Sequence, residues 1–437
     1  MSLLIILACI VLLVLLITRF KFNTFLAFLL VSLLTGLLLG MPVTALTASV
    51  QKGMGDLLGS LAIVIVSGAM LGKLVAESGA AQQITSGLMK VFGTRNIQWA
   101  LMITGFIVGI PLFYNVGFVL VIPLIFSAAY RFNLPVVYIG VPMLASLSVT
   151  HGFLPPHPSP TALVGQFNAD MGLTLVYGII IAIPTVILAG PLFARTLKKI
   201  QATPLQTFMP ADLPEDRLPA LGNSIFSSLL PVILLALTTL AAPFVPESGS
   251  FANGVRFFSE PDIVMLLALL YATWSLGIRS GMSMERITAI YGEAVKDISL
   301  ILLIIAGAGA LKQIMVDSGV STEIAGLLQD LDMDPLVLGW LIAATIRVCM
   351  GSATVSGLTA AGIVAPAIAG QSVDPNLMVL SIGAGSLMFS HVNDSGFWMF
   401  KEYFNLSIMD TIKSWSLMET IVAIAGLAFV LILDMFV

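Results

Sequence analysis

Charge is scarce in this chain: only 10% of its 437 residues are Asp, Glu, Lys or Arg, whereas a soluble domain has about 25%. Apolar residues make up 58% of the chain, and the mean hydropathy is +1.05. These values exclude a soluble globular fold. They predict an integral membrane protein with room for roughly ten helices of about 20 residues.

Cysteine and enzyme motifs are scarce as well. Cys9 and Cys349 both lie in apolar segments without the spacing of a metal site. The chain contains no HExxH, P-loop or GxSxG motif, and no GxGxxG after a predicted strand. We therefore expect a protein that is not an enzyme and binds no cofactor or metal. A net charge of −4 without a basic tract argues against nucleic acid as a partner.

The N-terminal apolar segment, Leu3 to Ile17, has no basic residue before it, and Arg19 and Lys21 follow it. A cleavable signal peptide has the opposite order. We expect this segment to be the first transmembrane helix, with the N-terminus outside the cytoplasm.

Apolar runs predict five crossings in each half of the chain. The first half has predicted spans at about 2–18, 24–40, 57–77, 134–152 and 172–194, and the second at about 223–244, 261–278, 297–317, 377–392 and 415–436. Two further apolar stretches, 98–129 and 335–370, are interrupted, and a re-entrant hairpin fits their short arms. A polar cytoplasmic linker, 195–222, separates a repeat at 1–194 from one at 223–437.

Polar landmarks recur in the same order in the two halves. Glu77-Ser-Gly79 matches Asp317-Ser-Gly319, and Phe167-Asn168 matches Phe404-Asn405. An odd number of crossings turns the second copy upside down, and basic residues gather on one predicted side. The sequence thus predicts an all-α polytopic membrane protein of two inverted repeats, with both termini periplasmic or extracellular.

Two polar breaks interrupt the apolar sequence, His151 to Thr161 and Ser390 to Trp398, and they contain all three histidines. Matching interruptions in two halves indicate a transporter's central binding site, and histidine suits proton coupling. In the first break, Ser159 is expected to cap a half-helix whose free N–H groups suit a carboxylate. A proline-rich loop outside the membrane is the alternative.

Charged residues at membrane depth are the sharper candidates, because they are costly there and usually functional. Asp394 could carry a proton, or it could simply cap the following helix. Arg347 could pair with Asp394 or with a substrate carboxylate. His391 could contact substrate or carry a proton, or pack as a satisfied histidine. Lys73 and Lys312 fall at span ends, where anchoring at the membrane interface is expected.

The hairpin tips supply hydroxyl and amide groups among small residues, an arrangement that also serves helix packing. We expect substrate contacts from Tyr114, Asn115, His151, His157, Thr161, Ser352, Thr354, Asn393 and Ser395. The candidates for proton coupling are Asp394, His391, Asn115 and Arg347.

Several segments form a specific set of motifs: His151-Gly-Phe-Leu-Pro-Pro-His157-Pro, Gly351-Ser-Ala-Thr-Val355, Ser390-His-Val-Asn-Asp394, Gly396-Phe-Trp398 and Phe400-Lys-Glu-Tyr-Phe-Asn405. In these segments, and over nearly its whole length, the chain resembles the gluconate permease (gluconate:H⁺ symporter) family. The resemblance implies uptake of sugar acids across the bacterial inner membrane, coupled to protons. It also implies a homodimer with a fixed scaffold domain and a transport domain that moves like an elevator.

Three positions depart from the family pattern. Asn115 stands where the family has Glu, Ser159 where Gly is usual, and Ser395 where Pro is frequent. If that Glu carries the proton, this chain is uncoupled or differently coupled, or it is an engineered variant. A transporter of another small hydroxy-carboxylate or of D-serine stays open as an alternative, as does a non-transporting membrane receptor.

Overall fold

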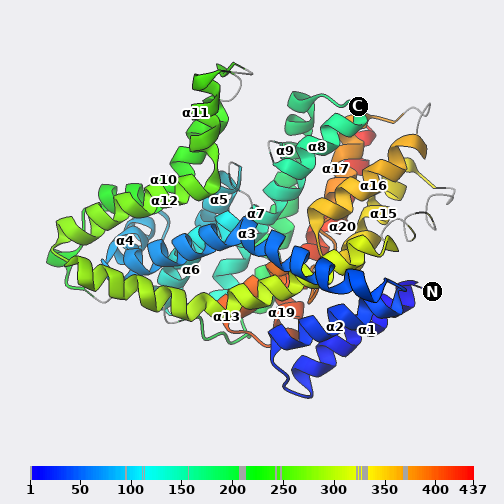
Figure 1. The fold of residues 1–437 in the computed structure, drawn as a ribbon. Coiled ribbons are helices and arrows are strands. Elements are labelled where there is room, and N and C mark those ends of the chain that lie inside the picture. Colours follow the sequence, from blue (N-terminus) through cyan, green and yellow to red (C-terminus); the bar gives the residue numbers. More distant parts are fainter. Residues whose placement is uncertain are drawn as a thin grey trace.

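All regular elements are helical in the part of the chain that the computed structural model describes (Figure 1). The described residues are 2–93, 96–110, 112, 114–155, 157–205, 213–241, 244–246, 249–320, 323, 326, 333–367 and 373–437. Among them, eight helices are long and apolar enough to cross a membrane, and six shorter helices are also apolar. The prediction of an all-α membrane protein is confirmed. The predicted count of five crossings in each half is not established by these lengths.

The first half contains the following elements: α1 Ser2–Thr18, α2 Thr24–Leu38, α3 Val43–Glu77, α4 Ala80–Phe92, α5 Ile97–Gly109, α6 Tyr114–Phe132, α7 Val136–Phe153, α8 Pro158–Phe167, α9 Met171–Ile187, η2 Leu188–Leu192 and η3 Arg195–Leu197. The described part of the linker contains η5 Glu215–Arg217, while residues 206–212 of the predicted linker lie outside the described residues.

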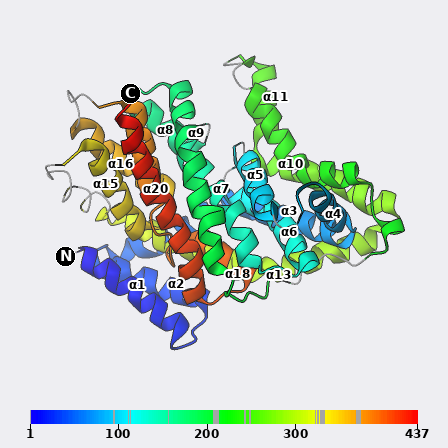
Figure 2. The ribbon, with the colours of Figure 1, turned by 180° about the vertical axis from the view of Figure 1, so that it is seen from behind.

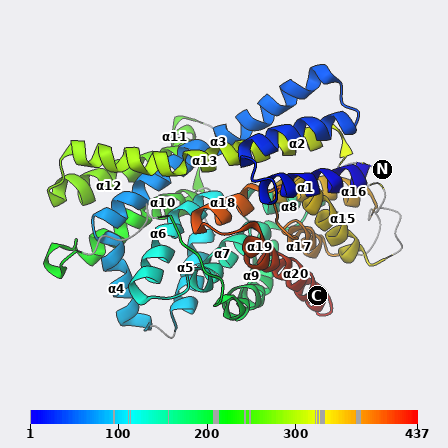
Figure 3. The same ribbon diagram turned by 90° about the horizontal axis from the view of Figure 1, so that it is seen from below.

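The second half contains α10 Leu221–Ala241, α11 Ser250–Ser259, α12 Pro261–Ala272, η7 Thr273–Gly277, η8 Ile278–Ser280, α13 Met284–Asp317, α15 Pro335–Met350, α16 Ala353–Ala367, α17 Pro375–Gly385, α18 Ser395–Phe404, α19 Ile408–Thr411, η9 Ile412–Ser416 and α20 Leu417–Asp434. Helices α1 to α3, α12 and α13 lie along one side of the molecule, over a bundle that includes α5 to α9 and α17 to α20 (Figure 3). Within this bundle, α9 and α20 run side by side (Figure 2).

Two helices, α3 and α13, are much longer than predicted. Both begin 13 or 14 residues before the predicted spans at 57 and 297. Their first turns contain polar residues such as Lys52 and Glu293, so hydropathy misses segments that are nevertheless helical. The two helices are antiparallel, because Lys73 pairs with Glu293 at 2.7 Å and Glu77 with Arg286 at 3.1 Å.

The crossing of α3 and α13 is a backbone contact made possible by two glycines. A Cβ atom on Gly53 would lie 2.3 Å from the Gly309 carbonyl oxygen, and one on Gly309 would lie 2.4 Å from the Gly53 oxygen. Small residues let membrane helices approach this closely. Position 53 and position 309 together therefore determine how near the two longest helices can come.

The landmarks that match between the halves occupy the same structural positions. The two long helices end in a Ser C-cap followed by glycine with positive φ, 78° at Gly79 and 71° at Gly319. The two half-helices α8 and α18 end at asparagines in the left-handed region, with φ of 51° at Asn168 and 50° at Asn405. The matched sequence signals therefore correspond to matched helix ends.

Both predicted polar breaks are interruptions between helices. Helix α7 ends at Phe153 and α8 begins at Pro158, while α17 ends at Gly385 and α18 begins at Ser395. The prediction that Ser159 caps α8 is wrong, because the helix begins earlier and its N-cap is His157. Residues Pro111 and Phe113 of the first hairpin break, and Pro156 of the first polar break, lie outside the described residues.

Replacing Gly53 by alanine should push α3 away from α13, because the new methyl group meets backbone that cannot rotate aside. We expect Gly53→Ala to cost about 1–3 kcal/mol of stability, seen as a lower melting temperature in detergent. Gly59 lies on the same helix with nothing within 4 Å of a built Cβ. Gly59→Ala is the control and should leave stability unchanged or raise it. Equal melting temperatures for the two variants would contradict the backbone contact.

Candidate substrate-binding site

A cavity of about 630 Å³ lies between the α3–α13 pair and the bundle. Its wall includes residues of α3, α6, α7, α12, α13, α15, α16 and α20 and of the turn before α18. Nine of the predicted site residues line it: Tyr114, Asn115, His151, Arg347, Ser352, Thr354, Asn393, Asp394 and Ser395. The residues that the sequence singled out therefore converge on one space, although they come from both halves of the chain.

Three predicted residues, His157, Thr161 and His391, are not part of the cavity wall. His157 is buried, and its Nε2 donates to the Gly109 carbonyl at 2.8 Å. That contact joins the first polar break to the end of α5. The His157 ring lies edge-on to His151, with centroids 5.4 Å apart. His157 therefore supports a residue that does face the cavity.

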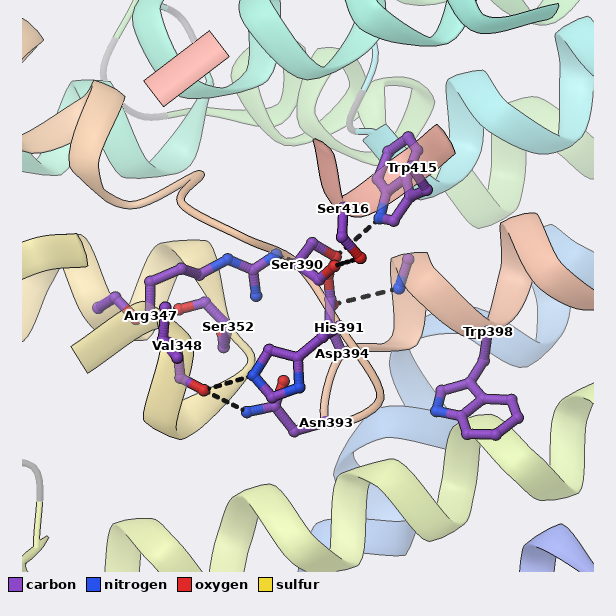
Figure 4. A network of polar contacts seen from close by, with 12 residues as sticks. Arg347, Val348, Ser352, Ser390, His391, Asn393, Asp394, Trp398, Trp415 and Ser416 are labelled. Atoms are coloured by element: carbon purple, nitrogen blue, oxygen red, sulfur yellow. Dashed lines mark hydrogen bonds and ion pairs between the residues drawn. The ribbon is translucent and has the colours of Figure 1, made fainter. Parts of the chain in front are cut away.

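An ion pair between Arg347 and Asp394 lies at the centre of the second break (Figure 4). Arg347 Nη2 donates to Asp394 Oδ2 at 2.6 Å, and the two side chains are 4% and 13% exposed. Asp394 also accepts hydrogen bonds from the Ser390 hydroxyl and from the Gly396 N–H, which makes it the N-cap of α18. The helix cap predicted for Asp394 and the pairing predicted for Arg347 with Asp394 therefore both form, on one carboxyl group.

Two side chains of the second break satisfy the carbonyl groups at the end of α15 (Figure 4). His391 Nε2 donates to the Val348 oxygen at 2.7 Å, and Asn393 Nδ2 donates to the Val348 and Cys349 oxygens at 2.8 and 2.9 Å. Carbonyls at a helix C-terminus have no partner within the helix. His391 therefore makes a packing contact in this conformation, as one of the alternatives predicted.

The tip of the second hairpin packs directly on this break. Gly351 has a φ of +71°, and a Cβ atom there would lie 2.2 Å from the Asn393 carbonyl oxygen. Only glycine allows both the left-handed backbone and this approach. Ser352 and Thr354 follow at the start of α16 and present hydroxyl groups to the cavity.

Several polar atoms on the cavity wall are buried without a hydrogen-bond partner. They are Tyr114 Oη, His151 Nδ1, Arg347 Nε and Nη1, Asn393 Oδ1 and both carboxyl oxygens of Glu419. Buried polar groups in proteins are nearly always hydrogen-bonded. A concentration of unused donors and acceptors around one cavity is therefore the signature of a site that binds a polar ligand. Within the described residues, no group of three or more His, Cys, Asp or Glu could hold a metal ion.

Sequence reasoning missed the other charged residues of the wall. Glu419 was passed over as one acidic residue in an apolar span, although its depth in the membrane was itself a signal. Lys312 lines the cavity and Lys73 is buried in an ion pair with Glu293, so both make protein contacts that the expectation of interface anchoring does not include. Glu260 and Asp262 reach the wall from a segment distant in sequence, which no local pattern reveals.

Breaking the buried ion pair from one side should cost more stability than removing both charges. Arg347→Gln or Asp394→Asn alone leaves one buried charge unpaired, at a cost of about 3–5 kcal/mol. We expect the double variant to lose less than the sum of the single losses, which melting temperatures in detergent can measure. The same set of single and double variants of Lys52 and Asp56, which form an exposed ion pair with side chains 59% and 61% exposed, is the control. The role of the buried pair is contradicted if its coupling free energy, the difference between the double loss and the sum of the single losses, is no larger than in that control.

The chain is similar to known membrane transporters along its full length. The family model described as GntP family permease matches residues 1–436. A high-affinity gluconate transporter of Escherichia coli K12 is 49% identical and a gluconate permease of Bacillus subtilis 168 is 42% identical, each over 100% of both chains. The Gnt-II system L-idonate transporter of Escherichia coli K12 is 45% identical over 99% of both.

Among solved structures, the YdaH transporter of Alcanivorax borkumensis matches with a TM-score of 0.45 and 16% identity, over 94% of this chain and 98% of that one. The sequence matches extend from one end of the chain to the other and include every segment that builds the cavity. The chain therefore belongs to the GntP permease family, and it is a multi-pass membrane transporter and not an enzyme.

Proposed function

We propose that this protein imports gluconate or a closely related sugar acid through the cavity between the α3–α13 pair and the bundle. The observation that carries the proposal is the set of unpartnered polar atoms around Arg347 and Asn393. A sugar acid has one carboxylate and a chain of hydroxyl groups. Arg347 Nε and Nη1 suit the carboxylate, and the cavity volume suits a ligand of this size.

Hydroxyl and amide side chains are placed to recognise the polyol chain. Asn115, Ser352 and Thr354 come from the starts of α6 and α16, and Asn393 comes from the second break. Each of these groups can donate or accept, as a substrate hydroxyl can. Lys312 adds a positive charge to the wall from α13. The names of the gluconate transporters at 42–49% identity agree with this chemistry.

Alternating access would move the two hairpins and the two broken helices against α10 and the layer formed by α1 to α3, α12 and α13. The antiparallel course of α3 and α13, with their matching C-terminal ends, supports two inverted repeats at 1–194 and 223–437. Inverted repeats around a midplane site are the usual basis of such motion. We further propose an elevator-like homodimer in the bacterial plasma membrane, with both termini periplasmic and transport coupled to protons.

L-Idonate is the second candidate substrate, because the relative named as an L-idonate transporter is 45% identical over nearly the full chain. L-Idonate and D-gluconate differ in configuration at one hydroxyl-bearing carbon. A cavity lined by several adaptable hydroxyl and amide groups gives no structural reason to exclude either. The two substrates can be separated only by their relative affinities.

Purified protein in liposomes should take up labelled gluconate, and an excess of unlabelled gluconate or L-idonate should inhibit that uptake. We expect D-serine to inhibit far less, since it offers one hydroxyl in place of a polyol chain. Liposomes without protein are the control. Absence of inhibition by gluconate would contradict the proposed substrate. Binding of gluconate without entry into the liposome would indicate a receptor.

Asn115→Glu tests the departure from the family pattern. The added carboxylate would face an anionic substrate, so affinity near neutral pH should fall roughly tenfold and recover as the pH is lowered and the carboxylate protonates. Asn115→Gln is the neutral control and should follow the native pH profile. Gluconate binding by titration calorimetry gives the comparison. If accumulation driven by a pH gradient occurs only after Asn115→Glu, the proposal that the native chain is proton-coupled is wrong.

A further inference from the structure

Glu419 is a buried carboxyl group that none of the contacts described so far uses. It lies in the first turn of α20, is 1% exposed, and lines the cavity. Neither carboxyl oxygen has a hydrogen-bond partner. Ser148 of α7, which also lines the cavity, is a polar neighbour of the carboxyl group. A carboxyl group with this much burial and so few contacts is expensive to keep ionised unless it has a function.

The position of Glu419 is determined by a π-helical segment, η9, directly before α20. The Ser416 hydroxyl donates to the backbone carbonyl oxygen of Ser390 at 2.5 Å, and Trp415 Nε1 donates to the Ser390 hydroxyl at 2.8 Å (Figure 4). Ser390 in turn donates to Asp394. Such π-segments frequently occur at functional sites. This one fixes α20 to the turn that carries the ion pair and so directs Glu419 to the cavity.

The two buried carboxyl groups of the cavity wall, Asp394 and Glu419, differ in their hydrogen bonds. Asp394 accepts hydrogen bonds from Arg347, Ser390 and the Gly396 N–H, and all three favour its ionised form. Neither oxygen of Glu419 makes a comparable hydrogen bond, and Ser148 is its polar neighbour. Protonating Asp394 would disrupt an ion pair and a helix cap, whereas protonating Glu419 disrupts neither.

Other charged and titratable groups surround Glu419. Arg347 of α15 and Asp394 interact with it electrostatically, and Glu419 does so with Tyr114 of α6. His151 of α7 and Lys312 of α13 line the same cavity. Of the other elements packed on α20, α17 and η2 carry no titratable side chain, α9 carries Tyr177, and η9 carries Lys413.

The formal charges of Arg347, Lys312, Asp394 and Glu419 cancel when both carboxyl groups are ionised, and the less buried Glu260 and Asp262 add two further carboxyl groups to the wall. A bound sugar-acid anion adds one more negative charge to a wall that holds no excess of positive charge. Protonation of Glu419 removes one, since a hydrated proton gives its H⁺ to a carboxyl oxygen and forms a neutral acid. Anion binding and proton binding therefore favour each other, and by linkage the effect is reciprocal.

We propose that Glu419 is the group that takes up and releases the coupled proton, while Asp394 stays ionised and holds Arg347 in place. This assignment rests on the proposed function, because it requires an anionic substrate in the cavity. Asp394 and His391 are among the candidates for proton coupling that the sequence indicates. This assignment instead places the coupled proton on Glu419, one turn beyond η9. Both oxygens of this side chain are free to bind a proton from water in the cavity.

Glu419→Gln keeps the shape of the side chain and makes it permanently neutral. In liposomes, the native protein should accumulate gluconate by up to about tenfold for each unit of pH difference. Glu419→Gln should bring internal and external gluconate only to equality, and it should still exchange labelled for unlabelled gluconate. A pH-sensitive dye inside the liposome should show acidification with gluconate entry for the native protein and not for this variant. Glu285→Gln, at an exposed residue of α13, is the matched control and should behave as native.

The outcomes distinguish this assignment from the proposed function. If the native protein transports gluconate but a pH gradient drives no accumulation, the proposal of proton coupling fails and Glu419 with it. If the native protein accumulates gluconate and Glu419→Gln does so equally, the assignment to Glu419 is wrong.

A second experiment applies if Glu419→Gln does not exchange labelled for unlabelled gluconate. The affinity for gluconate in detergent is then measured from pH 5 to pH 8. The assignment then requires that gluconate binding weakens as the pH rises in the native protein and is independent of pH in Glu419→Gln. Loss of binding in the variant contradicts it, while Glu419→Asp should retain a pH-dependent affinity.

Discussion

The structure depends on one constraint, which is that a helix interrupted in an apolar interior must satisfy its freed backbone groups within the protein. The second break shows how this chain does so. His391 and Asn393 bind the last carbonyls of α15, Asp394 binds the first N–H of α18, and Trp398 Nε1 donates to the Val392 oxygen at 2.7 Å. In the first break, His157 binds the Gly109 oxygen. The same polar residues that permit the breaks therefore also form or support the cavity.

Much of the fold could be predicted from the sequence, because hydropathy and helix-end signals are local. Helix α1 has the predicted bounds of the first span, and α2 begins where the second span was predicted to begin. The early starts of α3 and α13 could not be predicted, since their first turns mix polar and apolar residues and hydropathy measures partition into lipid. Each of these early segments contacts the later part of the other long helix, through Gly53 with Gly309 and through Glu293 with Lys73.

The cavity residues were predictable where they lie in a motif and not where only the fold brings them in. Asn393 and Ser352 belong to short polar segments that stand out from their surroundings. Glu419 and Lys312 each adjoin a long apolar run of their helix and belong to no motif, and only the tertiary structure shows which way they face. The different places of His151 and His157 have the same origin. Both were predicted to contact substrate, but only His151 lines the cavity, because His157 donates to the Gly109 carbonyl at the end of α5.

The contact between Gly351 and Asn393 has a consequence for how the site is exposed. Because the hairpin tip and the helix break touch through backbone atoms, with no side chain between them, they cannot separate without opening a void or freeing the carbonyls of α15. The hairpin tip and the second break thus form one continuous part of the cavity wall. Another part of the wall comes from Lys312 of α13 and the residues of α3. The binding surface is therefore divided along the boundary between the α3–α13 pair and the bundle, and it is not contained within the hairpin alone.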